Sequence, residues 1–122
     1  AQFLFYPTSI GFQASDTKVA NQQHAAWETI QRSHAIANGI FVASVNRVGR
    51  ENDLQFWGQS FICGPSGEIL ARASSTKNEV ITGSCDLKLI EETRQNWPFF
   101  RDRRTDAYQN LTKLYLDSNK NE

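Results

Sequence analysis

The sequence predicts an α/β protein in which helices pack on a sheet. Short apolar runs typical of strands alternate along the chain with longer segments whose apolar residues recur every three or four positions, as in helices. Glycine and proline turn signals separate these segments. The 122 residues are 39% hydrophobic, which is enough for one core. We therefore expect one domain, or a piece of one, over residues 1–117, and a polar tail at 118–122.

The N-terminal elements follow from these patterns. The run "FLFY" at residues 3–6 is expected to be a strand covered on both faces, which Pro7 ends because proline cannot donate to a ladder. Residues 8–21 are polar and aperiodic, so we expect a surface loop. Residues 22–38 form an expected amphipathic helix that Gly39 ends. The apolar stripe of that helix would be Ala26, Trp27, Ile30, His34 and Ala37.

A strand, a loop and a hairpin are expected next. Residues 40–45 are rich in β-branched and aromatic side chains and predict a buried strand, and residues 46–55 predict a polar loop. In residues 56–73, the segment "GPSG" separates an apolar stretch from an alternating one, which predicts a β-hairpin.

The C-terminal part is expected to hold one more strand and two helices. Residues 79–85 alternate as in a half-buried strand, and residues 87–97 predict a helix that Asp86 caps. Pro98 breaks this helix. A second helix is expected from Thr105 or Asp106, with Leu111, Leu114 and Tyr115 as its apolar stripe.

Charge and composition exclude several classes of partner. Thirteen basic and thirteen acidic residues cancel, so no long-range field favours nucleic acid or an anionic membrane. No apolar run approaches the length of a membrane span. The sequence holds only two cysteines, which we expect to be reduced thiols in a cytoplasmic protein.

The cysteines and histidines do not form a recognisable catalytic or metal motif. Cys63 and Cys85 each end an expected strand, which favours buried structural thiols over nucleophiles. His24 and His34 are ten residues apart, which is not the spacing of a helical metal pair. A zinc site made from these four residues is the less favoured alternative, and we expect no metal and no cofactor.

Two further groups of polar residues have both a structural and a functional interpretation. Arginine side chains in "RDRR" at residues 101–104 are able to clamp an oxyanion, but ion pairs that tie segments together are favoured. Tyr6, Pro7 and Thr8 follow a buried strand, and the carboxyl ends of strands are where open α/β sheets bind ligands. Spacing alone gives no complete catalytic set.

Four stretches resemble the carbon–nitrogen hydrolases of the nitrilase superfamily, and most closely its N-carbamoylputrescine amidohydrolase branch. They are "FLFYPTSIG", "AWETIQRSHAIANGIFVASVNRVG", "FWGQSFICGPSGEILARAS" and "NWPFFRDRRTDAY", in the family's order. The resemblance implies an α/β fold, specifically the C-terminal half of an αββα sandwich. It also implies a Glu-Lys-Cys triad whose three members would precede Ala1, so no catalytic residue is expected within the chain.

The resemblance also assigns roles to particular residues. Tyr6, Pro7 and Thr8 match the segment that lines the substrate pocket, and Asp16, in a variable loop, is a candidate to neutralise the ammonium group of a ureido amine substrate. Glu28, Arg32 and Asn46 match positions for which we expect structural roles. The family needs no cofactor. It self-associates, which implies a homo-oligomer in which the small residues Ala35 and Ala37 allow close approach of the helix at residues 27–38.

The main interpretation is that the chain is part of an amidohydrolase that converts N-carbamoylputrescine to putrescine, carbon dioxide and ammonia. One alternative is part of a sister hydrolase acting on another ureido compound or amide. A third reading is a truncated, non-catalytic interaction module, and by itself the chain is expected to be inactive.

Overall fold

A computed structural model describes residues 1–16 and 19–114 of the chain. The expected tail at 118–122 and Tyr115 lie outside the described residues. In chain order the elements are β1 (Phe3–Thr8), β2 (Gly11–Gln13), α1 (Ala20–Asn38), β3 (Phe41–Asn46), β4 (Val48–Glu51), β5 (Leu54–Trp57), β6 (Phe61–Cys63), β7 (Ile69–Arg72) and α2 (Lys88–Asn96), followed by 3₁₀ turns at Thr105–Ala107 and Gln109–Thr112.

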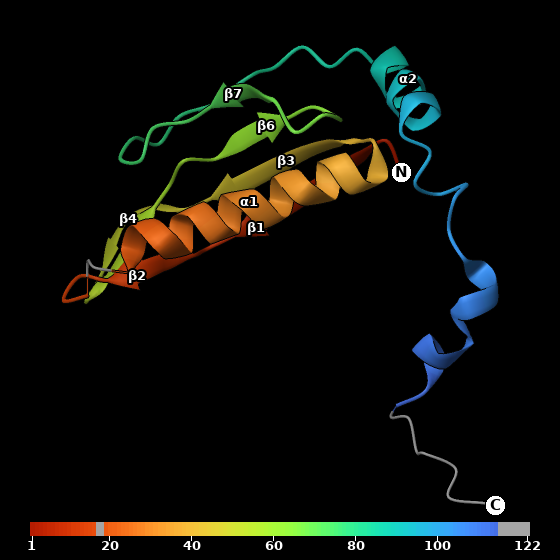
Figure 1. The fold of residues 1–122 in the computed structure, drawn as a ribbon. Helices are drawn as coiled ribbons and strands as arrows, with labels where there is room; N and C mark the ends of the chain where they lie inside the picture. Colours follow the sequence, from red (N-terminus) through yellow and green to blue (C-terminus); the bar gives the residue numbers. More distant parts are fainter. Residues whose placement is uncertain (17–18, 115–122) are drawn as a thin grey trace, which may run out of the picture.

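The main sheet has four strands in the order β1-β3-β6-β7, and helix α1 lies along one of its faces (Figure 1). Strands β1 and β3 are parallel and are joined through α1, whereas β6 and β7 pair antiparallel to their neighbours. A smaller sheet, in the order β2-β5-β4, continues from one end of the main sheet. The mixed α/β layers match the fold class predicted from the sequence.

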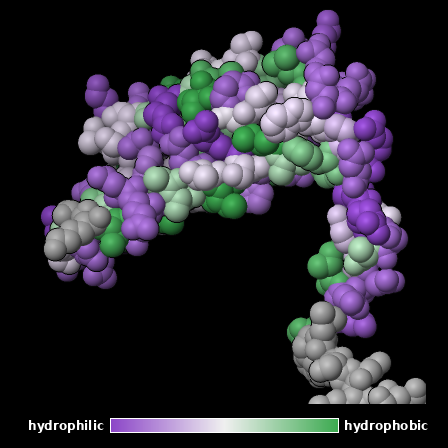
Figure 2. Space-filling view, in the orientation of Figure 1, coloured by the Kyte–Doolittle hydropathy of each residue, from purple (hydrophilic) through white to green (hydrophobic). Residues whose placement is uncertain are grey.

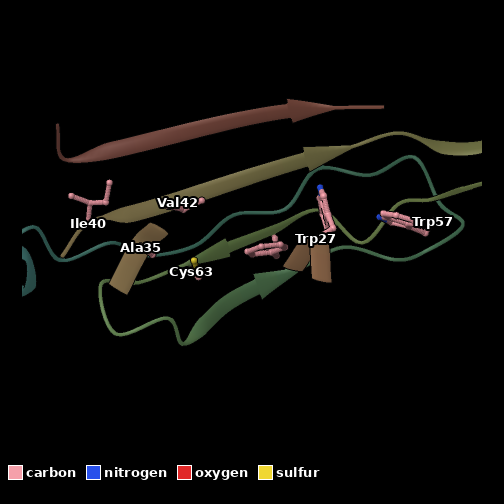
Figure 3. Packing of buried hydrophobic residues seen from close by; sticks show 7 residues of the cluster. Trp27, Ala35, Ile40, Val42, Trp57 and Cys63 are labelled. Carbon is pink, nitrogen blue, oxygen red and sulfur yellow. The ribbon is translucent and has the colours of Figure 1, made fainter. Parts of the chain in front are cut away.

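The hydrophobic core lies between α1 and the main sheet (Figure 3). Its buried members are Trp27, Ala35, Ile40, Val42, Trp57, Phe61 and Cys63. Helix α1 ends at Gly39, which has a left-handed φ of 56° and donates its N–H to the carbonyl of Ile36. This left-handed residue turns the chain back so that β3 runs under the helix, because glycine adopts positive φ without a steric penalty.

The buried face of α1 differs from the predicted stripe. Ile30 is 54% exposed and Ala37 is also exposed, whereas Gln31 is buried. A polar residue occupies the core-facing position because its amide is satisfied there: its oxygen bonds the Ser44 hydroxyl and its nitrogen donates to the Trp27 carbonyl. Hydropathy therefore placed Trp27 and His34 of the stripe correctly, whereas Ala26, Ile30 and Ala37 are exposed.

The strand and loop boundaries also differ from expectation near the N-terminus. Strand β1 runs through Pro7 to Thr8, because β1 is an edge strand and tolerates a residue without an N–H. It is covered on the α1 face only, since Phe5 on the opposite face is 69% exposed. The two expected loops contain short strands: β2 lies within residues 8–21, and β4 with the first half of β5 lies within residues 46–55.

The hairpin expected at residues 56–73 is present as β6 and β7, but the strand expected at 79–85 is not formed. That segment has no regular secondary structure. Ile81 and Cys85 are half-buried and Val80 is 91% exposed, but Gly83 is exposed too, so burial follows the expected alternation only in part. The expected helix after Asp86 is α2, and the Asp86 carboxylate accepts the N–H of Lys88 at 3.0 Å.

The second C-terminal helix is replaced by two 3₁₀ turns. Leu111 and Leu114 of its expected apolar stripe are 78% and 94% exposed, and this part of the chain extends away from the sheet (Figure 1). A helix needs a surface on which to bury its stripe, and the described residues provide none here. Within the described residues, no helix has the length and apolar character needed to cross a membrane.

Candidate functional site

The carboxyl end of β1 lies beside the carboxyl end of β3, with Tyr6, Pro7 and Thr8 paired with Ser44, Val45 and Asn46. Because side chains alternate along a strand, Tyr6 and Thr8 lie on the α1 face and Pro7 on the opposite, exposed face. The three residues predicted to contact substrate are therefore adjacent in the chain but do not share one face.

The Tyr6 ring packs against the hydrophobic core and lies 5.9 Å from the His34 ring. Thr8 is held by its hydroxyl, whose oxygen lies 3.0 Å from both the Val45 carbonyl and the Asn46 Oδ1. A hydroxyl has one proton, so it donates to one of these acceptors at a time and keeps its lone pairs.

A shallow groove of about 660 Å³ includes residues that follow the end of β1, but Tyr6, Pro7, Thr8 and Asp16 are not among its lining residues. Its wall comes from Ile10 and Gly11 on one side and from Trp27 and Trp57 on the other, with Ile30 among its other lining residues. The sequence did not indicate Ile10 as a site residue, because a lone isoleucine in a polar segment carries no pattern.

Asp16 lies in an exposed turn after β2, where its N–H donates to the carbonyl of Gln13 at 2.8 Å. The turn is attached to the β4–β5 connection through the Ala14 N–H, which donates to the Asp53 carbonyl at 2.8 Å. Asp16 is therefore exposed to solvent, and its turn follows β2, which pairs with β5.

Both cysteines are free thiols. Cys63 is fully buried, and the loss of hydration raises its pKa to about 11, so it stays protonated at neutral pH. Burial also raises the pKa of the Cys85 thiol. Neither has the lowered pKa of a nucleophile. Across residues 1–16 and 19–114, no group of three or more His, Cys, Asp or Glu side chains is arranged to hold a metal ion.

Three rings, those of His24, Trp27 and Trp57, meet at the start of α1, with centroids 5.5 to 6.0 Å apart. The ring nitrogens His24 Nε2, Trp27 Nε1 and Trp57 Nε1 are buried and have no hydrogen-bond partner in the described part of the chain. Burial is the main cause that lowers the pKa of His24, so its imidazole is neutral at pH 7. Sequence spacing did not reveal this cluster, because Trp57 comes from the β5 strand.

Glu28 connects α1 to the β6–β7 hairpin through two arginines. Its carboxylate oxygens lie 3.2 Å from Arg32 Nη1 and 2.8 Å from Arg72 Nη1, and Arg32 Nε donates to the Gly67 carbonyl at 2.7 Å. The Arg72 hydrogen bond is the main cause that lowers the pKa of Glu28. These contacts agree with the structural roles expected for Glu28 and Arg32.

The arginines of residues 101–104 pair locally and in solvent. Arg101 bonds its neighbour Asp102, and Arg104 bonds Asp106 two residues away. These pairs join no distant segments, so the expected tie between parts of the chain is not seen in the described residues.

The sequence and the fold are similar to those of known carbon-nitrogen hydrolases. A family model described as carbon-nitrogen hydrolase matches residues 1–95. A crystal structure of a carbon-nitrogen hydrolase from Helicobacter pylori G27 is 45% identical and superposes with a TM-score of 0.88, covering 95% of this chain and 42% of that one.

Curated relatives with related names cover most of this chain. N-carbamoylputrescine amidase of Arabidopsis thaliana is 39% identical over 98% of this chain. Citrullinase of Francisella tularensis is 30% identical over 94% of it, and human omega-amidase NIT2 is 38% identical over 88%. The chain spans 41%, 41% and 36% of the lengths of these three relatives.

Proposed function

Because the chain belongs to the carbon–nitrogen hydrolase family, we propose that the protein hydrolyses the ureido C–N bond of N-carbamoylputrescine. The observation that supports this substrate is the 39% identity to plant N-carbamoylputrescine amidases over 98% of the chain. Since the chain spans 41% of their length, the proposal concerns the activity of the whole protein.

The proposed reaction follows the triad implied by the resemblance, with all three members outside the 122 residues. A cysteine thiolate attacks the ureido carbon, and the amine nitrogen of putrescine leaves with a proton delivered by the glutamic acid. Water then attacks the carbamoyl thioester and releases the thiol, carbon dioxide and ammonia. One water is consumed for each putrescine, carbon dioxide and ammonia formed.

The residues of this chain would form one wall of the substrate site. The hydroxyl oxygen of Thr8 keeps lone pairs able to accept from a ureido N–H, since its own proton is donated to a protein acceptor. Tyr6 would contribute to this wall with Thr8 on the α1 face of β1, whereas Pro7, on the opposite face, would contact substrate only past the end of the strand. Asp16 would offset the charge of the distal ammonium group, and no cofactor takes part in this scheme.

The names of other relatives support a second candidate substrate class. Citrullinase and omega-amidase NIT2 are 30% and 38% identical to the chain, so a ureido amino acid or a simple linear amide is the alternative. The third possibility is a non-catalytic module that binds another polypeptide.

Ammonia release by the complete gene product tests these possibilities together. N-carbamoylputrescine, citrulline and a neutral linear amide are supplied at equal concentrations, and kcat/KM is compared. A preference for N-carbamoylputrescine supports the proposal. A preference for citrulline or the amide would contradict it and would identify the protein as a sister hydrolase of the same family. Absence of turnover with every substrate would favour the non-catalytic module.

Two further properties belong to this proposal. We propose a homo-oligomer whose contact includes the outer face of α1, where Ile30 and Ala37 are exposed (Figure 2 shows apolar residues among polar ones along this side). Ala35 cannot contribute as the sequence suggested, because it is fully buried against the chain's own sheet. We also propose a cytoplasmic location, which cell fractionation would test.

A further inference from the structure

The side chain of Asn46, the last residue of β3, has a partner for each of its two N–H groups and two for its oxygen, one of which, the Thr8 hydroxyl, it shares with the Val45 carbonyl. Its Oδ1 accepts from the Ile10 N–H at 2.9 Å and from the Thr8 hydroxyl at 3.0 Å. Its Nδ2 donates to the carbonyls of Ile10 at 3.0 Å and Gly58 at 3.2 Å. The residue is 7% exposed, so a lost partner would not be replaced readily by water.

Two of these bonds reproduce a strand pair. Ile10 lies between β1 and β2, where its main chain has left the β1–β3 ladder. The Asn46 carboxamide accepts from the N–H of Ile10 and donates to its carbonyl, which is what the peptide groups of a neighbouring strand would do. The side chain therefore continues the sheet past the point where the backbone pairing of β1 and β3 ends.

The same side chain also fixes the opposite side of the groove. Gly58, at the end of β5, has a left-handed φ of 59° and follows Trp57, and it accepts the second Nδ2 proton. The backbone of Asn46 is itself held by the Ser60 hydroxyl, which bonds its N–H at 2.9 Å and its carbonyl at 3.3 Å. Two segments, residues 8–10 and Gly58, are thus bonded to one carboxamide, and Ser60 holds the backbone that carries it.

We propose that Asn46 is the positioning residue of the site: its carboxamide holds the Thr8–Gly11 segment at the distance from Trp57 that the groove requires. The identification of this groove wall with a substrate wall rests on the proposed function, but the positioning itself does not. Loosening the segment by about an ångström would misplace the substrate, and displacements of that size cost up to roughly 10²-fold in rate.

The test compares Asn46→Ala with Ser44→Ala in the complete gene product. Ser44 is a matched control, because it is a buried polar residue on the same strand that bonds Gln31 instead of residues 8–10. Amide hydrogen exchange is measured residue by residue. We expect the Ile10 amide to exchange roughly tenfold faster in Asn46→Ala, with β3 core amides unchanged, and to be unaffected in Ser44→Ala.

The KM of the enzyme distinguishes a positioning role from a purely structural one. A general loss of folded enzyme lowers kcat per mole and leaves KM unchanged, whereas a displaced wall raises KM. We expect Asn46→Ala to raise KM for the ureido substrate roughly tenfold, more than it lowers kcat, and Ser44→Ala to leave KM unchanged. Should the alanine variant not fold, Asn46→Ser leaves a smaller cavity and a short hydroxyl that does not span both sides of the groove, and a change in the same direction is expected.

The exchange and kinetic results are independent. An unchanged Ile10 amide in the Asn46 variants, or an acceleration spread evenly over all core amides, would overturn the positioning role. If the unsubstituted protein hydrolyses none of the substrates, the proposed function fails, while Ile10 exchange still decides the inference.

Discussion

Replacement of Glu28 by glutamine should cost the protein about 2 kcal/mol of folding free energy at pH 7. Glu28 accepts hydrogen bonds from two arginines, each worth about 1.5 kcal/mol when the acceptor is charged. Glutamine has one acceptor oxygen, so it keeps one of these bonds, weakened to about 1 kcal/mol because the acceptor no longer carries a charge. We use the low end of the range because the side chains of Arg32 and Arg72 are 41% and 34% exposed, although that of Glu28 is only 16% exposed.

The stabilisation that Glu28 provides should depend on pH, in a direction set by its shifted pKa. The pKa of Glu28 is lowered in the folded state, chiefly by the Arg72 hydrogen bond, so the unfolded chain binds more protons. The stabilisation is therefore complete above the unfolded pKa of about 4.3 and is lost as the pH falls through the lower, folded pKa. The gap between the original protein and Glu28→Gln should close as the pH falls from 7 toward 3.

Urea unfolding of the complete gene product, followed by far-ultraviolet circular dichroism, measures this gap at each pH. Glu51→Gln is the matched control, because Glu51 pairs with Arg47 at the same four-residue separation but with both side chains about half exposed. The control should lose less than about 0.5 kcal/mol. Equal losses in the two variants, or a Glu28→Gln loss that does not change with pH, would refute the reasoning.

Three further outcomes are expected. Iodoacetamide at pH 8 should leave the Cys63 peptide of the native protein unmodified, because the thiol is buried with a raised pKa; peptide mapping checks this, and rapid labelling would contradict it. Ala37→Glu should weaken self-association in light scattering with little loss of stability, because Ala37 is exposed on α1 and does not line the groove, and an unchanged particle mass would contradict the proposed contact. Asp16→Asn should raise KM roughly threefold or more for the cationic ureido substrate and leave KM for a neutral amide unchanged; equal effects on both would remove Asp16 from the site.

Elements marked by strong local signals were predictable from the sequence. The turn "GPSG" separates β6 and β7 as expected, and Asp86 and Gly39 mark helix ends where local chemistry requires them. Strands β2 and β4 were missed because they are three or four residues long and lie in polar segments, and Phe56 and Trp57 of β5 were assigned to the first arm of the hairpin. Their pairing depends on partners distant in the chain, which no local pattern shows.

The candidate site at the carboxyl end of β1 stays a prediction, because the groove that follows it in the chain is lined by Ile10 and Gly11 and not by Tyr6, Pro7 or Thr8. The network around Asn46 was not predictable in detail, because it joins residues 8–10, 46 and 58 that only the folded topology brings together. The burial of Gln31 likewise depends on Ser44, thirteen residues away, so hydropathy could not reveal it.

The rotation of α1 about its axis, which puts Gln31 inside and Ile30 outside, has a consequence for how variation in this protein would be interpreted. Adjacent positions on one helix are therefore under different selection. Substitutions at inward positions change the stability of the single chain, and substitutions at outward positions change its association with other copies. Natural variants only one residue apart on α1 should therefore fall into two classes, those that lower the amount of protein in the cell and those that leave the amount unchanged.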